Sequence, residues 1–175
     1  KQERVILVEG YMDAIGVAPA GIGEVVASCG TSLTDRQVRT LARYSQRIIV
    51  NFDPDAAGAN ATERSLQALL GENFRVRVLQ LPEGLDPDEY VKKYGAEGYL
   101  AQLDHASGYF YWLADKIGLD PIAEMGEKLG FGHPSGIELS PETPGIMPTE
   151  AFHERVDKGY SKGFALNAAI GQGAV

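Results

Sequence analysis

The chain has 175 residues, of which 44% are hydrophobic and 23% are charged, a composition typical of a globular protein with one good core and room for a second small unit. Its formal net charge is -8, from 16 Lys and Arg against 24 Asp and Glu, which argues against a broad basic surface for nucleic acid. If the substrate is a nucleotide or a polynucleotide, we therefore expect a metal to mediate the phosphate contacts and the basic track to lie on another domain.

The composition also bears on the compartment. No stretch is apolar for long enough to cross a membrane, and Lys1, Glu3 and Arg4 lead directly into an apolar run without the pattern of a signal peptide. Because Cys29 is alone, an internal disulfide is excluded, and we expect a small buried residue in a cytoplasmic protein. The chain begins with Lys1 and not with Met, so we expect a piece of a larger protein.

Short apolar runs alternate with segments of helical length through the first half of the chain. The expected strands cover residues 4–8, 25–28, 48–52 and 75–80, and the expected helices cover residues 11–18, 34–44, a segment around 66–70, and 89–94. Thr34 followed by Gln37 is the pattern of a capping box. This order predicts an α/β fold with a parallel four-stranded sheet, right-handed crossovers and helices on both faces.

Carboxylates follow three of these four strands. Glu9 ends the first strand, Asp53 and Asp55 end the third, and Asp86 and Asp88 come after the fourth. The carboxyl ends of parallel strands meet at one edge of the sheet, where α/β proteins place their ligand sites. We therefore expect these five side chains to gather at that edge.

Asp53 and Asp55 need a compensating charge. Side chains two apart on an extended segment lie on the same side, and at ~5 Å and an effective dielectric constant of about 20 they repel by roughly 3 kcal/mol. Carboxylates without nearby His or Cys favour Mg²⁺ or Mn²⁺ over zinc. The alternative is that Asp55 caps a helix that starts at Ala56 and Asp53 is a solvated loop residue.

Gly10, directly after Glu9, allows a turn that a Cβ would hinder.

Four blocks of residues carry a family signature. They are Val8–Asp13 (VEGYMD), Ala27–Thr34 (ASCGTSLT), Asn51–Gly58 (NFDPDAAG) and Asp86–Asp88 (DPD). With these blocks, residues 1 to about 112 resemble the TOPRIM domain of bacterial replicative DNA primases. Pro54 departs from the pattern, since the family more often has Gly there.

The resemblance implies roles for six carboxylates and a cofactor. Glu9, Asp53 and Asp55 would be catalytic and would bind Mg²⁺ or Mn²⁺. Asp86 and Asp88 would complete the acidic cluster, and Asp13 would contribute from the following helix. The resemblance thus adds one expected ligand, Asp13, to the five carboxylates at the strand ends.

The implied chemistry is nucleotidyl transfer in RNA primer synthesis for DNA replication. The implied partners are nucleoside triphosphates and a single-stranded DNA template, bound through flanking domains that are missing here, and a replicative helicase. A primase also needs a zinc-binding template reader and a basic subdomain before the TOPRIM fold. The domain alone is therefore expected to hold metal without making primers.

The last third of the chain has a different composition and a second resemblance. Its blocks are 117–125, 128–132, 134–139, 142–149 and 166–173. In this order they resemble a stretch of the transpeptidase domain of class B penicillin-binding proteins. The chemistry of that family does not transfer, because its Ser-x-x-Lys, Ser-x-Asn and Lys-Thr-Gly motifs do not occur in the sequence.

These two resemblances predict a chimera, with a TOPRIM domain over residues 1–115, an incomplete transpeptidase fragment over 116–175, and a junction between 107 and 118. Two alternatives to a primase-type function are a cell-wall transpeptidase fragment without its catalytic serine and a non-catalytic α/β module.

The remaining expectations concern the second half. We expect a helix from Ala96 to about Lys116 whose aromatic run, residues 109–112, packs on the sheet. Helices are expected near residues 121–129 and 164–170, joined by an irregular loop over 134–148. His105, His133 and His153 have no ligand spacing and are expected at the surface.

Overall fold

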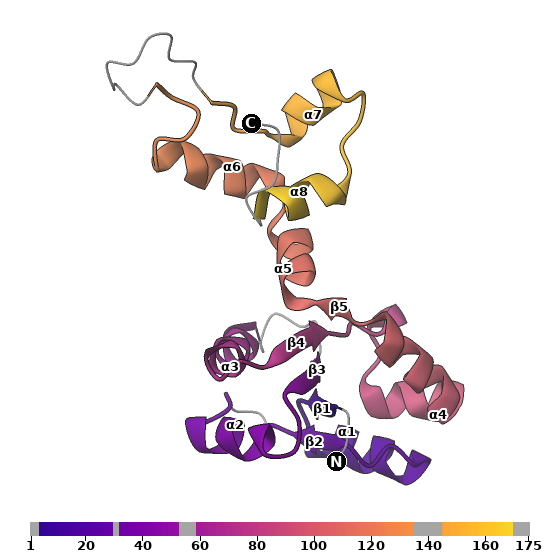
Figure 1. The fold of residues 1–175 in the computed structure, drawn as a ribbon. Coiled ribbons are helices and arrows are strands. Elements are labelled where there is room, and N and C mark those ends of the chain that lie inside the picture. The colour runs from indigo at the N-terminus through magenta and orange to yellow at the C-terminus, as the bar shows by residue number, and fades with distance from the viewer. Residues whose placement is uncertain (1–3, 30–31, 53–58, 135–144, 170–175) are drawn as a thin grey trace. The chain divides into compact units, whose positions relative to one another are not determined.

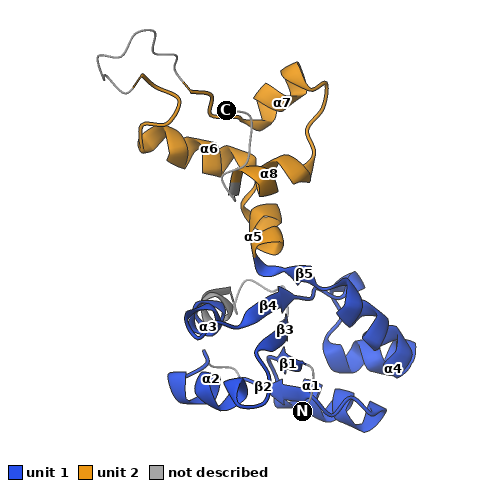
Figure 2. Cartoon of the chain, viewed as in Figure 1, with its two compact units in different colours: residues 1–109 blue, residues 110–175 orange. Residues whose placement is uncertain are grey.

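The computed structural model describes residues 4–29, 32–52, 59–134 and 145–169. The chain forms two compact units, residues 1–109 and residues 110–175 (Figure 2). The division falls a few residues before the expected domain boundary at 115. Each unit is described by itself below.

Unit 1 is built on a five-stranded sheet in the order β2-β1-β3-β4-β5 (Figure 1). The strands β1 (Val5–Val8), β2 (Val25–Ala27), β3 (Arg47–Asn51) and β4 (Arg75–Val78) are parallel, as predicted. β1 and β3 are buried on both faces, so they consist of nearly continuous apolar residues. The short strand β5 (Ser107–Gly108) pairs antiparallel with β4 and was not predicted.

Helices cover both faces of this sheet. α1 (Tyr11–Val17) and α4 (Pro87–His105) lie on one face, and α2 (Asp35–Ala42) and α3 (Ala59–Gly71) lie on the other (Figure 1). Short 3₁₀ turns lie at Ala18–Ala20 and Pro82–Gly84. The core under α1 and α4 contains Ile6, Val8 and Ile49, which share one face because strand side chains alternate. The fold places the carboxyl ends of the parallel strands at one edge, as expected.

The capping box before α2 is present. Thr34 Oγ1 accepts a hydrogen bond from the Gln37 amide at 3.4 Å, and Gln37 Oε1 accepts one from the Thr34 amide at 2.8 Å.

α4 is longer than expected and is kinked. Gly95 has φ 73° and interrupts the helix, so the expected segment 89–94 and the segment that begins at Ala96 are the two limbs of one element. The prediction that this helix continues to Lys116 is wrong. The guanidinium of Arg77 donates to the carbonyls of Asp104 and Ala106, and residues 107–108 pair with β4, so the chain leaves the helix at this point.

Unit 2 is helical. It comprises most of α5 (Tyr109–Ile117), then α6 (Leu119–Lys128), α7 (Glu150–Val156) and α8 (Lys162–Ala169). α6 and α8 match the two helices expected in this part, but α7 was not predicted. Thr149 caps α7 by accepting a hydrogen bond from the Phe152 amide at 3.1 Å. Of the expected loop over 134–148, residues 135–144 lie outside the described residues, and 145–148 are in no helix or strand.

Several expectations about burial are wrong. Cys29 is exposed, in the turn two residues after β2, with φ 59°. Phe110 and Tyr111 expose 57% and 62% of their surface, so the aromatic run does not pack as a whole. His153 is buried, because its ring stacks on Phe164 with centroids 3.7 Å apart. None of the described helices is both long and apolar enough to span a membrane.

Candidate metal centre

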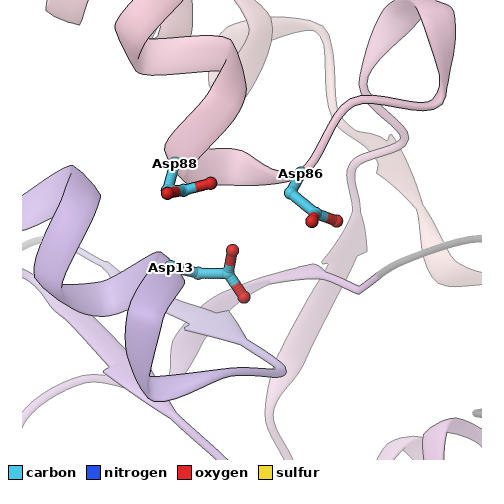
Figure 3. A group of neighbouring side chains, drawn as sticks. All are labelled: Asp13, Asp86 and Asp88. Carbon is cyan, nitrogen blue, oxygen red and sulfur yellow. The ribbon is translucent and has the colours of Figure 1, made fainter.

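Three carboxylates of unit 1 converge at the carboxyl edge of the sheet. Asp13 lies in the first turn of α1, Asp86 precedes α4 as its N-cap residue, and Asp88 lies in the first turn of α4. One oxygen from each comes within 4.8 Å of the other two. Figure 3 shows Asp13 pointing toward the two side chains at the start of α4.

The side chain of Asp13 is held by the turn that opens α1. Its Oδ2 accepts a hydrogen bond from the Gly10 amide at 3.0 Å. Gly10 has φ -91° and ψ 147°, which any residue adopts, so the turn itself does not demand glycine. A Cβ at Gly10 would instead lie 3.0 Å from Asp13 Oδ2. The glycine therefore makes room for the carboxylate of Asp13.

Asp88 has a cationic partner that sequence reasoning missed. Lys92 Nζ lies 2.6 Å from Asp88 Oδ2, one helical turn along α4. The hydrogen bond to Asp88, and then the charge of that carboxylate, raise the pKa of Lys92 above its ordinary value. The i, i+4 spacing of the two residues was the available signal.

The other three predicted ligands, Glu9, Asp53 and Asp55, are not among the three carboxylates that converge in the described part of the structure. Glu9 is half-buried after β1, and its carbonyl accepts a hydrogen bond from the Cys29 amide at 2.9 Å. It is not part of the described group of three. Asp53 and Asp55 lie outside the described residues. β1 and β3 end side by side, with Val8 in register with Asn51, so Glu9 and Phe52 follow the two strands at the same edge of the sheet.

The chemistry of the group fits a hard divalent cation. All three ligand atoms are carboxylate oxygens, and neither His nor Cys belongs to this group of described residues. Such oxygens suit Mg²⁺ and Mn²⁺, and the repulsion among three anions would be relieved by a bound cation.

Unit 1 is similar in sequence to a known protein family. A family model described as Toprim-like matches residues 6–91. The parallel sheet, the acids at its carboxyl edge and this match support a Toprim-like domain in unit 1.

Curated proteins with similar sequences include DNA primases, which supports a primase-type Toprim domain. The DNA primase of Lactococcus lactis is 44% identical over 156 residues, which cover 87% of this chain and 24% of that protein. The DNA primase of Synechococcus elongatus is 33% identical over 175 residues, which cover 96% of this chain and 25% of that protein.

Solved structures agree with the sequence relatives. The E. coli primase catalytic core is 27% identical and superposes with a TM-score of 0.64, over 98% of this chain and 53% of that one. A DnaG primase catalytic domain bound to ssDNA is 31% identical, with a TM-score of 0.63 over 73% of this chain and 44% of that one. The fold is thus the α/β fold of a primase catalytic core, followed by a helical part.

The comparisons do not support the second resemblance. The similarity to the Synechococcus elongatus primase extends over 96% of the chain, and therefore into the segment that resembles a transpeptidase. The chain spans only about a quarter or less of the length of the curated primases that it matches.

Proposed function

We propose that unit 1 binds Mg²⁺ or Mn²⁺ and is the metal-binding part of a nucleotidyl-transfer centre of the DNA primase type. The convergence of Asp13, Asp86 and Asp88 within 4.8 Å is the observation that carries this proposal. The similarity to DNA primases supplies the class of reaction.

Each acid has a role in this proposal. Asp13, Asp86 and Asp88 would hold a cation from one side of the sheet edge, and Glu9, Asp53 and Asp55 are assigned to the same centre by the resemblance alone. A divalent ion there would neutralise charge on the phosphate oxygens of a nucleoside triphosphate and would activate the attacking hydroxyl. The protein would position the ligands, with Lys92 balancing the charge of Asp88 before metal binds.

The partners follow from the same class. We propose nucleoside triphosphates and a single-stranded DNA template, since a similar DnaG catalytic domain has been solved bound to ssDNA. The net charge of -8 indicates that basic contacts to the template come from elsewhere in the protein. A replicative helicase and a cytoplasmic location belong to the proposal as consequences of primer synthesis. Primer synthesis by these 175 residues alone is not expected.

The test is a Mn²⁺ titration followed by calorimetry and by the melting temperature. Wild type should melt at a higher temperature as Mn²⁺ is added, following RT ln(1 + [L]/Kd). Asp13→Asn should lose most of this response, because it removes the charge while its side-chain oxygen can still accept from the Gly10 amide. Asp53→Asn tests the ligand that is assigned by resemblance.

Asp35→Asn is the matched control. Asp35 is an exposed acid in the first turn of α2, on the opposite face of the sheet. Its substitution by Asn removes one negative charge, as Asp13→Asn does, but at a position distant from the cluster. Equal metal responses in wild type, Asp13→Asn and Asp35→Asn would refute the site.

A further inference from the structure

Asn51, the last residue of β3, is a buried polar residue that joins three elements. It exposes 3% of its surface. Its Nδ2 donates to the carbonyl of Leu79, directly after β4, at 3.3 Å. Its Oδ1 accepts a hydrogen bond from the hydroxyl of Tyr99, in α4, at 2.9 Å. One side chain thus ties the ends of two strands to a helix.

Tyr99 is the helical end of this connection. It has no exposed surface, and it lies in the same helix that carries Asp88 and follows Asp86. Burial, and then the negative charge of Asp13, raise the pKa of Tyr99 well above its ordinary value. At neutral pH the hydroxyl keeps its proton and donates it to Asn51 Oδ1.

The position of Asn51 relates the pair to the acidic edge. Asn51 lies in register with Val8, the residue before Glu9, and it stands two residues before Asp53 in the sequence. The surrounding core is apolar, with Ile49 and Leu103 among its members. Asn51 also satisfies the Leu79 carbonyl, but an apolar side chain in place of Tyr99 would suit this core about as well, so packing alone does not account for the Tyr99 hydroxyl.

We propose that Asn51 and Tyr99 are positioning residues of the metal centre, whose hydrogen bond fixes the second limb of α4 against the carboxyl end of β3. The ring of Tyr99 lies 6.4 Å from that of Tyr90 in the first limb, so the bond also holds the limb that begins at the acids. Neither side chain is a ligand in this inference, which rests on the proposed function. Without the bond, α4 and β3 would keep their apolar contacts, but Asp86 and Asp88 at the start of α4 would be less well aligned with Asp13.

The experiment measures the Kd for Mn²⁺ in Tyr99→Phe, in Asn51→Leu and in the double variant. Each single variant should bind about 10-fold more weakly than wild type, the lower end of the loss seen when groups that orient metal ligands are removed. The double variant should bind Mn²⁺ no more weakly than Asn51→Leu alone, because Tyr99→Phe breaks only the shared bond, whereas Asn51→Leu also removes the donor to the Leu79 carbonyl. Circular dichroism confirms that each protein is folded at the temperature used.

Ser65→Ala separates positioning from general loss of stability. Ser65 is a buried residue of α3 whose Oγ accepts a hydrogen bond from the Leu33 amide at 3.1 Å, on the other face of the sheet. Its variant should be less stable but should bind Mn²⁺ with the Kd of wild type.

The outcomes distinguish this inference from the proposed function. If wild type binds Mn²⁺ and the Asn51 and Tyr99 variants bind it equally well, the inference alone is overturned. The same holds if Ser65→Ala weakens binding as much as they do. If wild type does not bind Mn²⁺, the proposed function fails and the positioning role fails with it.

Discussion

Gly16 of α1 packs directly against Asp88 of α4. A Cβ built on Gly16 would overlap the Cβ of Asp88 and would lie 3.1 Å from its Cα. This contact lies one turn after Asp13 on α1 and at the first turn of α4. The absence of a side chain at Gly16 therefore sets how closely the two acid-bearing helices approach.

Gly16→Ala should push α1 and α4 apart. We expect a loss of about 1–3 kcal/mol in the free energy of unfolding, because the added methyl overlaps the Cβ of Asp88 and meets its backbone Cα, not the end of a flexible side chain. The Kd for Mn²⁺ should also rise, since Asp13 and Asp88 separate. Gly71→Ala in α3 is the control, because a Cβ there meets nothing within 4 Å. Thermal unfolding and calorimetry of the two variants check the prediction, and equal behaviour would contradict it.

Lys92→Gln should tighten metal binding. Lys92 lies 2.6 Å from Asp88 Oδ2 and so competes with a cation for that oxygen. Because Lys92 is largely exposed and solvent screens the ion pair, we expect only a two- to fivefold decrease in Kd. Lys93→Gln removes the same charge one residue along, where the partner is Glu83 at 2.6 Å. Calorimetric titration with Mn²⁺ should show a change for Lys92→Gln alone.

The features of unit 1 that are local in sequence could be predicted. The first three parallel strands followed from apolar runs and the fourth from its alternation of polar and apolar residues. The start of α2 followed from Thr34 and Gln37, because a capping box is made within four residues. The meeting of Asp86 with Asp13 was expected from the strand-end rule together with the family resemblance. Lys92 was missed although its spacing from Asp88 is the ordinary spacing of a helical ion pair.

The features that depend on distant residues could not be predicted. The bond between Tyr99 and Asn51 joins positions 48 apart, and no local pattern indicates it. The end of α4 depends on Arg77, whose guanidinium binds carbonyls almost 30 residues later. The burial of His153 depends on Phe164 in the next helix.

Tyr99 should make the stability of unit 1 depend on alkaline pH. Burial raises the pKa of Tyr99 above its ordinary value of 10.0, so the folded state keeps a proton that the unfolded state releases. Its contribution to stability is complete below pH ~10 and is lost as the pH rises above that value, with a slope of up to about 1.4 kcal/mol per pH unit.

Urea unfolding between pH 8 and pH 11 measures this slope. Tyr99→Phe should unfold with a shallower pH dependence than wild type. Tyr11→Phe should keep the wild-type slope, because Tyr11 is 62% exposed. Parallel curves for all three proteins would show that Tyr99 is not the titrating group.

His153 should be the main aromatic contact that stabilises unit 2. Its ring stacks on Phe164 at 3.7 Å and meets Phe152 edge-on at 5.4 Å, and its Nδ1 lies 2.6 Å from Asp157 Oδ2. His153→Ala should therefore cost about 2–4 kcal/mol, through lost contacts and the cavity left behind. His153→Phe should cost less, because it keeps the stack and removes only the partner of Asp157. His133→Ala, at an exposed position, should be close to neutral.

The single Trp of the chain, Trp112, lies in unit 2, so its fluorescence during urea unfolding reports on this unit. If His153→Ala and His133→Ala unfold at the same urea concentration, the stacked ring is not what holds α7 against α8.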